Sequence, residues 1–318
     1  MVKKGQPSFL EAFASPSLGK NDVLDQILAT VRWYRFEKIL SKLEPEGPGR
    51  PPHEPLMMFK GLLLAQLYNL SDAGLEEALN DRVSFRRFVG LTLEKAAPDH
   101  TSLCRFRNRL ATEGMAQRLF AEFDRQLEKQ HLVLKRGTML DATLVQAATG
   151  KPPQGDEKDA LDADAAFAKR HGKPGSVYGY KAHIGADQGT RLIRSAMVTA
   201  ANVNETMVAD SLVRGDEKAV YADKAYQSRT RRAALKARGI KARIMHKSWG
   251  GGPPLGHWQR RHNSLIAPIR ASVETVFAVL KRRMGYTRAR YRGLSKNLNH
   301  FLLLAIAYNM RRASALAA

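Results

Sequence analysis

Three acidic residues from separate segments are the strongest candidates for chemistry in this 318-residue chain. Asp141 and Asp223 each lie in a short apolar run, and Glu274 follows in a patterned segment further on. Magnesium prefers oxygen ligands, and two such ions about 3.5–4 Å apart activate the attacking oxygen and stabilise the leaving one in phosphoryl transfer. We therefore predict that Asp141, Asp223 and Glu274 are catalytic residues and the ligands of two Mg²⁺ ions. Each aspartate taken alone fits an ordinary acid at a turn or strand end equally well.

Two basic residues accompany Glu274. Residues 269–284 predict one helix, because apolar residues recur at steps of three and four. Arg270, Glu274 and Lys281 follow the same spacing along a second line of that helix. Glu274 would then face an open site, with Arg270 and Lys281 placed to hold an anion such as a phosphate. The alternative is a solvated helix face with weak ion pairs.

The first part of the chain has the apolar spacing of helices throughout. We predict an all-α domain over residues 1–130. Its helices are expected at residues 23–40, 56–68, after Ser71-Asp72, around Phe85 and Phe88, from Pro98 onward, and over 115–130.

The helix that begins near Pro98 resembles the second helix of a helix-turn-helix. Leu103, Phe106 and Leu110 would face inward. Arginine and asparagine suit guanine and adenine edges in the major groove, although an ordinary surface helix can have the same face. The predicted DNA-contacting residues on the outer face are Arg105, Asn108 and Arg109.

Strand patterns dominate the second part, residues 131–318. Strands are expected at residues 137–147, 178–184, 191–199, 218–226 and 240–245, with helices at 204–213, 229–238, 269–284 and 296–312. Residues 149–175 are polar and contain Gly and Pro, so we predict a loop there. Two antiparallel pairings followed by strand-helix-strand crossovers predict a mixed five-stranded α/β sheet with flanking helices.

The chain carries 52 Lys and Arg against 30 Asp and Glu, a formal charge of +22. Such a charge favours a polyanionic partner, and nucleic acid is the first candidate. An anionic membrane surface is the competitor, but we find no basic amphipathic helix with an exposed Trp or Phe face. Further DNA-contacting residues are predicted after Glu274, with a solvated basic face as the alternative. They are Lys281, Arg282, Arg283, Arg288, Arg290 and Arg292, with Tyr286 and Tyr291.

Cysteine usage and the first residues predict the compartment. Cys104 is the single cysteine, which excludes an intrachain disulfide and fits a reducing cytoplasm. The opening residues have the charge of a signal peptide without its apolar core, so we expect no export. Residues 301–307 are apolar but far shorter than the ~20 residues that cross a bilayer.

With these residues assembled, the chain resembles the DDE transposases of bacterial insertion sequences, most of all the insertion-sequence-five group. The resemblance is carried by residues 67–72, 84–91 and 98–107 in the first part and by 140–145, 179–183, 198–203, 222–226 and 270–274 in the second. It implies a ribonuclease-H-like catalytic domain after a terminal-repeat-binding domain. It also assigns Asp141, Asp223 and Glu274 as the catalytic triad, with Mg²⁺ that Mn²⁺ can replace.

The family's signature of Tyr, two residues, Arg, three residues, Glu, six residues, Lys matches at Arg270, Glu274 and Lys281. Ala267 stands at the position of the Tyr, so a contact assigned to that Tyr in relatives is not expected here. No long insertion separates Asp223 from Glu274.

These observations predict a transposase that binds the inverted repeats of its own element, hydrolyses a phosphodiester and joins the freed 3′-hydroxyl to target DNA. Two element ends imply a homodimer or higher assembly on double-stranded DNA in the bacterial cytoplasm, at the nucleoid. One alternative is a sequence-specific DNA-binding regulator without catalysis. The other is a structure-selective nuclease of the same fold, which would cut without strand joining.

Overall fold

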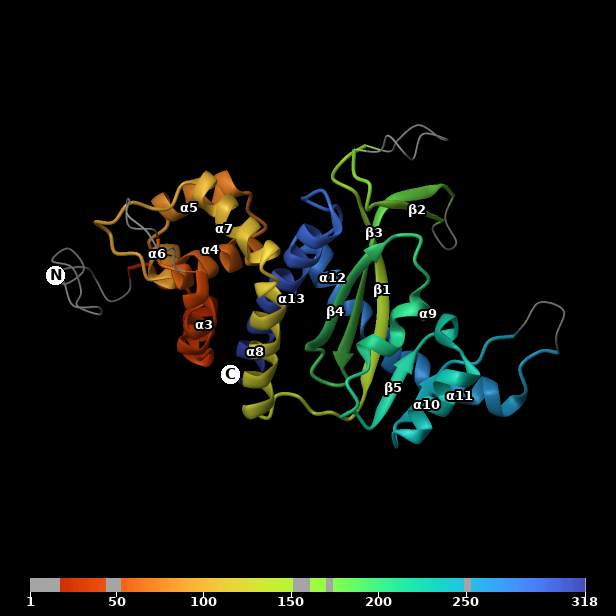
Figure 1. The fold of residues 1–318 in the computed structure, drawn as a ribbon. Helices are drawn as coiled ribbons and strands as arrows, with labels where there is room; N and C mark the ends of the chain where they lie inside the picture. The colour runs from red at the N-terminus through yellow and green to blue at the C-terminus, as the bar shows by residue number, and fades with distance from the viewer. Residues whose placement is uncertain (1–17, 44–52, 151–160, 170–173, 249–252, 318) are drawn as a thin grey trace. The chain divides into compact units, whose positions relative to one another are not determined.

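The computed structural model describes residues 18–43, 53–150, 161–169, 174–248 and 253–317 (Figure 1). The chain divides into two compact units, Met1–Gln126 with Ile306–Ala318 and Leu127–Ala305. We call them the helical unit and the sheet unit. The predicted class, a mixed α/β sheet preceded by a helical region, is confirmed.

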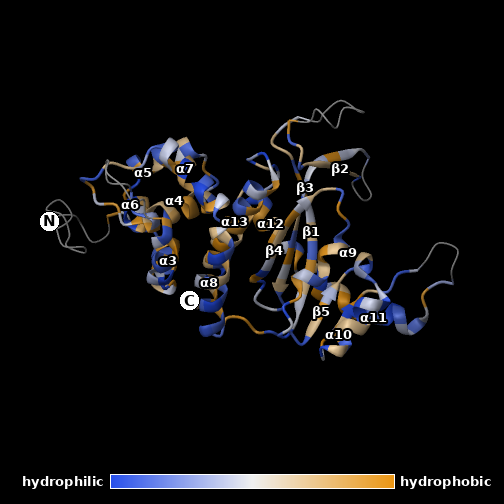
Figure 2. Cartoon of the chain, viewed as in Figure 1, coloured by the Kyte–Doolittle hydropathy of each residue, from blue (hydrophilic) through white to orange (hydrophobic). Residues whose placement is uncertain are grey.

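The helical unit is built around α4, whose side chains are apolar nearly all round. Met58, Phe59 and Leu63 of this helix are buried, as expected for a helix enclosed by its neighbours. Figure 2 colours the chain by hydropathy, and hydrophobic residues predominate in α4. Its elements are α2 (Asp22–Thr30), α3 (Trp33–Leu40), η1 (Ser41–Leu43), α4 (Pro55–Leu67), α5 (Asp72–Asp81), α6 (Val83–Val89), α7 (His100–Thr112) and α8 (Met115–Lys129).

The single helix predicted over residues 23–40 is wrong. The structure has two helices there, because the helical conformation is interrupted between α2 and α3. Val31 is extended, with φ −91° and ψ 132°. The Arg32 N–H donates to Oε1 of Gln126 at 2.9 Å, and Nε2 of Gln126 donates back to the Arg32 carbonyl. A side chain distant in sequence therefore satisfies the backbone at the break, and local periodicity could not reveal it.

Helix α7 begins where the sequence predicted. Asp99 caps it by accepting a hydrogen bond from the Ser102 N–H at 2.7 Å. Leu103 and Leu110 are buried as expected, whereas Phe106 is half-buried. Arg107 is also buried and pairs with Asp72 at the start of α5, which joins α7 to α5.

The sheet unit contains a mixed sheet in the order β2-β3-β1-β5-β6, with β4 paired to β3. The pairs β1–β3, β2–β3 and β3–β4 are antiparallel, whereas β1–β5 and β5–β6 are parallel. The strands are β1 (Thr138–Gln146), β2 (Ala166–Lys169), β3 (Ser176–Asp187), β4 (Ile193–Ala200), β5 (Ala219–Ala222) and β6 (Lys241–Ile244).

Helices flank this sheet. They are α9 (Glu205–Val208), η3 (Ala209–Leu212), η4 (Lys224–Tyr226), α10 (Arg229–Ala237), α11 (His257–Ala271), α12 (Glu274–Arg282) and the first part of α13 (Leu294–Ala317), whose residues from Ile306 on belong to the helical unit. Leu140, Val220 and Ile244 from the strands and Leu235 from α10 form one buried cluster. The apolar faces of strands and helices thus meet in a common core.

The five predicted strands are confirmed, and β2 is a sixth that the sequence did not predict. It lies inside the segment predicted as a loop, residues 149–175, and pairs with the first four residues of β3. Four residues are too few to show a period-two pattern. Residues 151–160 and 170–173 of that segment lie outside the described part of the chain.

The hydrogen-bonded ladder between β1 and β5 is short and ends before Asp141, so the edge of β1 at Asp141 is not paired with β5. Its described register joins Thr138 to Val220 and Met139 to Tyr221, and Asp141 follows two residues later. At the far end of β1, the Gln146 carbonyl accepts a 2.7 Å hydrogen bond from the Ala289 N–H. The edge of β1 between these two points borders the segment that follows β5.

The single helix predicted over residues 269–284 is also wrong. It is two helices, α11 and α12, separated at Ser272 and Val273. The Ser272 hydroxyl donates to the Ile269 carbonyl at 2.7 Å, and the Val273 N–H donates to the Arg270 carbonyl at 3.1 Å. These bonds to the third preceding residue tighten the chain locally and interrupt the α-helical pattern.

One stretch of the described chain, His257–Arg282, is long and apolar enough to cross a membrane by length and composition. A core helix passes the same test, so one such stretch is a weak indication. It comprises α11 and α12, where Ile266, Val276 and Leu280 are buried within the sheet unit.

Candidate active site

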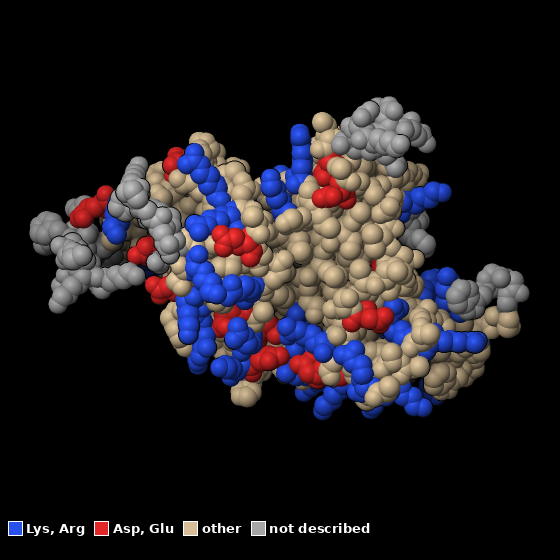
Figure 3. Space-filling view, in the orientation of Figure 1, with Lys and Arg blue, Asp and Glu red and all other residues tan. Residues whose placement is uncertain are grey.

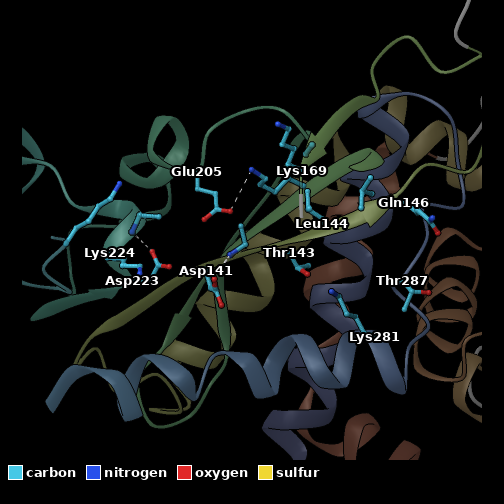
Figure 4. A pocket seen from close by; sticks show the side chains of 16 residues that line it. Asp141, Thr143, Leu144, Gln146, Lys169, Glu205, Asp223, Lys224, Lys281 and Thr287 are labelled. Atoms are coloured by element: carbon cyan, nitrogen blue, oxygen red, sulfur yellow. Dashed lines mark hydrogen bonds and ion pairs between the residues drawn. The ribbon is translucent and has the colours of Figure 1, made fainter. Parts of the chain in front are cut away.

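Asp141 and Asp223 line one cavity of about 830 Å³ in the sheet unit (Figure 4). Asp141 comes from the edge of β1, and Asp223 comes directly after β5. Oδ1 of Asp223 accepts a 2.7 Å hydrogen bond from the Ala225 N–H, which fixes the carboxylate at the start of η4. The structure therefore brings the two predicted aspartates together.

The carboxyl group of Asp141 is largely buried, with 13% of its side chain exposed. Oδ1 accepts from the Ala142 N–H at 2.9 Å, and Oδ2 accepts from Nη2 of Arg270 at 3.2 Å. Burial raises the pKa of Asp141 to about 6, although the Arg270 charge and the Ala142 N–H oppose the shift. The charges of Glu205 and Asp223 raise this pKa further.

Glu274 does not line the cavity with the two aspartates. Its side chain is 60% exposed, and Oε1 accepts a 2.7 Å hydrogen bond from Nη1 of Arg270. Arg270 therefore bridges Glu274 and Asp141. Burial alone would lower the pKa of Arg270, but the charges of Asp141, Asp223 and Glu274 outweigh it and raise that pKa.

Lysines contribute most of the positive charge around the cavity. Lys281, one of the predicted basic residues, is among its lining residues. The other lining lysines are Lys169, Lys181, Lys224 and Lys247. They come from strands and loops far apart in the chain, so spacing within one element gave no signal for them. Positive side chains beside carboxylates suit a site that receives a phosphodiester.

Glu205 is a lining residue that the sequence analysis did not select. It is the first residue of α9, and its sequence signal was no more than a helix start after Asn204. Its carboxylate lies 3.7 Å from Nζ of Lys181.

The basic residues predicted after Glu274 have different surroundings. Arg282 and Arg283 are exposed, and Arg290 is half-buried. Arg288 is exposed, but its guanidinium donates to the carbonyls of Ala147 and Ala148 at 3.0 and 2.9 Å. Arg288 thus anchors its segment beyond the end of β1.

The predicted DNA contact by Tyr286 is wrong. Tyr286 is buried and stacks on Phe301, with ring centroids 5.1 Å apart. An apolar partner on α13 takes the face that an unpaired base would need. Tyr291 is half-buried and makes an edge contact with His300.

The predicted recognition residues of α7 also differ among themselves. Arg105 is exposed, and Asn108 is half-buried with its amide 3.6 Å from Sγ of Cys104. Arg109 is bound within the helical unit, since its guanidinium donates to the Leu43 carbonyl at 2.8 Å and to Glu113 at 3.0 Å. Of the three predicted residues, Arg105 is therefore the most exposed to solvent.

A basic groove of about 500 Å³ lies between α3 and α8 on the helical unit. Its bases are Arg35, Lys38, Lys42, Arg118 and Arg125, and its other lining residues are Tyr34, Ile39 and Glu122. Basic side chains gather on the faces of both units shown in Figure 3. We call this feature the α3–α8 groove; the sequence analysis missed it because α3 and α8 are far apart in the chain.

The residue types around the cavity fit a divalent cation, because the acids supply oxygen donors. The geometry is not yet that of a metal centre. Within the described residues, no group of three or more His, Cys, Asp or Glu side chains is arranged to hold a metal ion. The positive charge between Asp141 and Glu274 is the guanidinium of Arg270, which forms an ion pair with each of them.

Two protein-family models match this chain. The family model described as "Transposase DDE domain" matches residues 134–310, more than half of the chain. A second model, described as "Transposase domain", matches residues 14–109. The chain belongs to the DDE transposase family. DDE transposases generally use divalent metal ions, and the resemblance inferred from the sequence is confirmed at this level.

Among solved structures, this transposase is similar to a piggyBac transposase synaptic complex with hairpin DNA, determined by cryo-electron microscopy. The identity is 14% and the TM-score is 0.46. The match covers 94% of this chain and 73% of that one.

Replacing Asp141 by Asn should stabilise the metal-free transposase above pH 6. The folded-state pKa of about 6 lies above the unfolded value of about 3.9, so the unfolded chain loses its proton first. Stability from the protonated carboxyl is present below about pH 4 and is lost as the pH rises to about 6. Asp141→Asn avoids that loss, which amounts to about 3 kcal/mol at pH 8.

Urea unfolding in EDTA at pH 4, 6 and 8 measures this effect. The difference between variant and wild type should be near zero at pH 4 and largest at pH 8. Asp81→Asn, on the exposed face of α5, is the control and should change stability by less than about 0.5 kcal/mol at each pH. A gain from Asp141→Asn that is the same at pH 4 and pH 8 contradicts the burial argument.

Proposed function

We propose that this transposase cleaves DNA at the ends of its element and joins the freed 3′-hydroxyl to target DNA at the cavity of Asp141 and Asp223. One observation carries the proposal: two aspartates from separate segments line one cavity together with several lysines. Carboxylates suit the cations of phosphoryl transfer, and lysines suit the phosphates of the substrate. A purely apolar or purely basic cavity would not combine these two properties.

Asp141, Asp223 and Glu274 are the proposed ligands of two Mg²⁺ ions, which Mn²⁺ can replace. When bound, the ions activate the attacking oxygen and stabilise the leaving one. The carboxylates of Asp141 and Asp223 already face the cavity. Glu274 can join them once its carboxylate exchanges Arg270 for a cation, since the two helices α11 and α12 hold it beside Asp141 through that arginine.

Arg270 has two roles in this proposal. In the metal-free protein its guanidinium neutralises Asp141 and Glu274. With cations bound to these carboxylates, the Arg270 guanidinium would be available next to the site to bind a phosphate of the DNA backbone. Lys281 and the other lining lysines hold the neighbouring phosphates.

The helical unit is the proposed terminal-repeat-binding part. Arg105 and Asn108 on α7 would contact base edges, and the α3–α8 groove would bind backbone phosphates. We further propose the division at residue 130, membership in the insertion-sequence-five group, a location at the nucleoid in the cytoplasm, and a homodimer or higher assembly that joins two element ends.

Cleavage and strand transfer on DNA with the element's own ends test the catalytic proposal. With Mg²⁺ the wild type should nick at the ends and join them to a target duplex. Glu274→Gln and Asp223→Asn should bind the same DNA and lower the nicking rate at least about 100-fold, because each removes charge stabilisation worth several kcal/mol. Glu77→Gln, an exposed acid on α5, is the matched control and should cut at the wild-type rate.

The alternatives give other outcomes in the same assay. Specific binding without cutting by the wild type would identify a regulator. Cutting without strand joining or end preference would identify a nuclease. The first outcome would contradict the proposed catalytic activity. The second would contradict only the proposed strand-transfer step.

Charge reversal in the α3–α8 groove tests the proposed phosphate contact. Lys38→Glu should weaken binding to any duplex and reduce the slope of log affinity against log salt by about 1, because one phosphate contact is lost. Lys95→Glu makes the same change in net charge at an exposed loop outside the groove and should leave the slope unchanged. Fluorescence anisotropy at several salt concentrations measures both. Equal slopes for the two variants contradict a specific role of the groove.

A further inference from the structure

Glu205 reaches the same cavity as Asp141 and Asp223, from a third element of the sheet unit (Figure 4). It follows β4 and is the first residue of α9. Glu274, the acid that the family motif supplies, is not among the lining residues. The acid that faces both aspartates across the cavity is therefore one that the motif does not name.

A buried arginine holds Glu205 close to Asp223. Arg231 on α10 is 6% exposed. Its guanidinium donates to the Thr206 carbonyl at 2.5 Å and to the Tyr226 carbonyl at 2.8 Å. Thr206 adjoins Glu205, and Tyr226 ends the short helix that begins after Asp223. The two acidic segments are thus fixed to each other by hydrogen bonds away from the cavity.

Lys181 on β3 is the positive partner of Glu205. Its Nζ lies 3.7 Å from Oε1 of Glu205 and donates to the Val203 carbonyl at 2.9 Å. A separation of 3.7 Å exceeds a hydrogen-bond length, so the ion pair leaves acceptor capacity on the Glu205 oxygens. The lysine charge offsets the carboxylate without saturating it.

Tyr226 is buried beside the same three acids. Its side chain is 1% exposed, and its hydroxyl makes no well-aligned hydrogen bond with a described residue. The charges of Glu205, Asp141 and Asp223 all act on this hydroxyl, and Glu205 is its nearest acceptor. A buried hydroxyl among three acids is available to donate to Glu205 or to a water bound beside them.

We propose that Glu205 is an additional cation-binding residue of the active site, which holds a divalent ion with Asp141 and Asp223. Lys181 is its counter-ion in the metal-free protein and competes with the metal. This inference rests on the metal-dependent site proposed above and adds a ligand to it. The simpler account is that Lys181 and Glu205 form an ion pair that only stabilises the fold.

Mn²⁺ binding to the full chain in the absence of DNA separates the two accounts. Free Mn²⁺ is measured by electron paramagnetic resonance during titration. Glu205→Gln should weaken binding at least about tenfold, and Glu205→Asp, which keeps the charge, should weaken it less. Lys181→Met should tighten binding, because a competing positive charge is removed. Glu77→Gln is the control, and circular dichroism checks that each variant is folded.

The outcomes decide the proposal. Wild-type affinity in Glu205→Gln overturns it, as does absence of Mn²⁺ binding by the wild type at millimolar Mn²⁺. Unchanged affinity in both Glu205→Gln and Lys181→Met identifies a structural ion pair. Asp141→Asn distinguishes the two levels of the argument. If it loses Mn²⁺ while Glu205→Gln does not, the catalytic site stands without Glu205; if it also binds normally, the cavity is not the metal site.

Discussion

The repulsion between carboxylates is the constraint on which the catalytic half of this transposase depends. Asp141, Asp223, Glu205 and Glu274 cannot share one region as anions unless positive charge is placed among them. Arg270 supplies that charge by bonding Asp141 and Glu274, and Lys181 supplies it at Glu205. The metal-free site is thus balanced by side chains that a bound cation would displace. The raised pKa of Asp141 comes first from burial, and the charges of Glu205 and Asp223 add to it.

The sheet makes this arrangement possible. The ladder between β1 and β5 ends at Met139, so Asp141 lies on an edge that adjoins the segment after β5. Asp223 begins that segment and caps η4 with its own carboxylate. Hydrogen bonds from Arg231 then bring α9 against it. The acids are carried by strands and caps with fixed backbones, as a preorganised site requires.

Much of this could be predicted from sequence, for reasons that are local. Apolar spacing located every strand except β2 and nearly every helix, and an acid within or directly after a strand marked Asp141 and Asp223. Three features depended on distant residues and could not be predicted. Gln126 bonds the backbone of Arg32 where the helix is interrupted. Arg231 bonds the Thr206 carbonyl next to Glu205, and Phe301 stacks on the buried Tyr286. Periodicity describes one element and carries no information about such contacts.

The central claim is that the cavity of Asp141 and Asp223 is a cation site held ready by Arg270. Anomalous scattering from crystals soaked in Mn²⁺ tests it most directly. We predict a Mn²⁺ peak in contact with both aspartates, with the guanidinium of Arg270 no longer bonded to Asp141. A cavity without Mn²⁺ under saturating conditions, with the Arg270 to Asp141 bond still in place, would contradict the account.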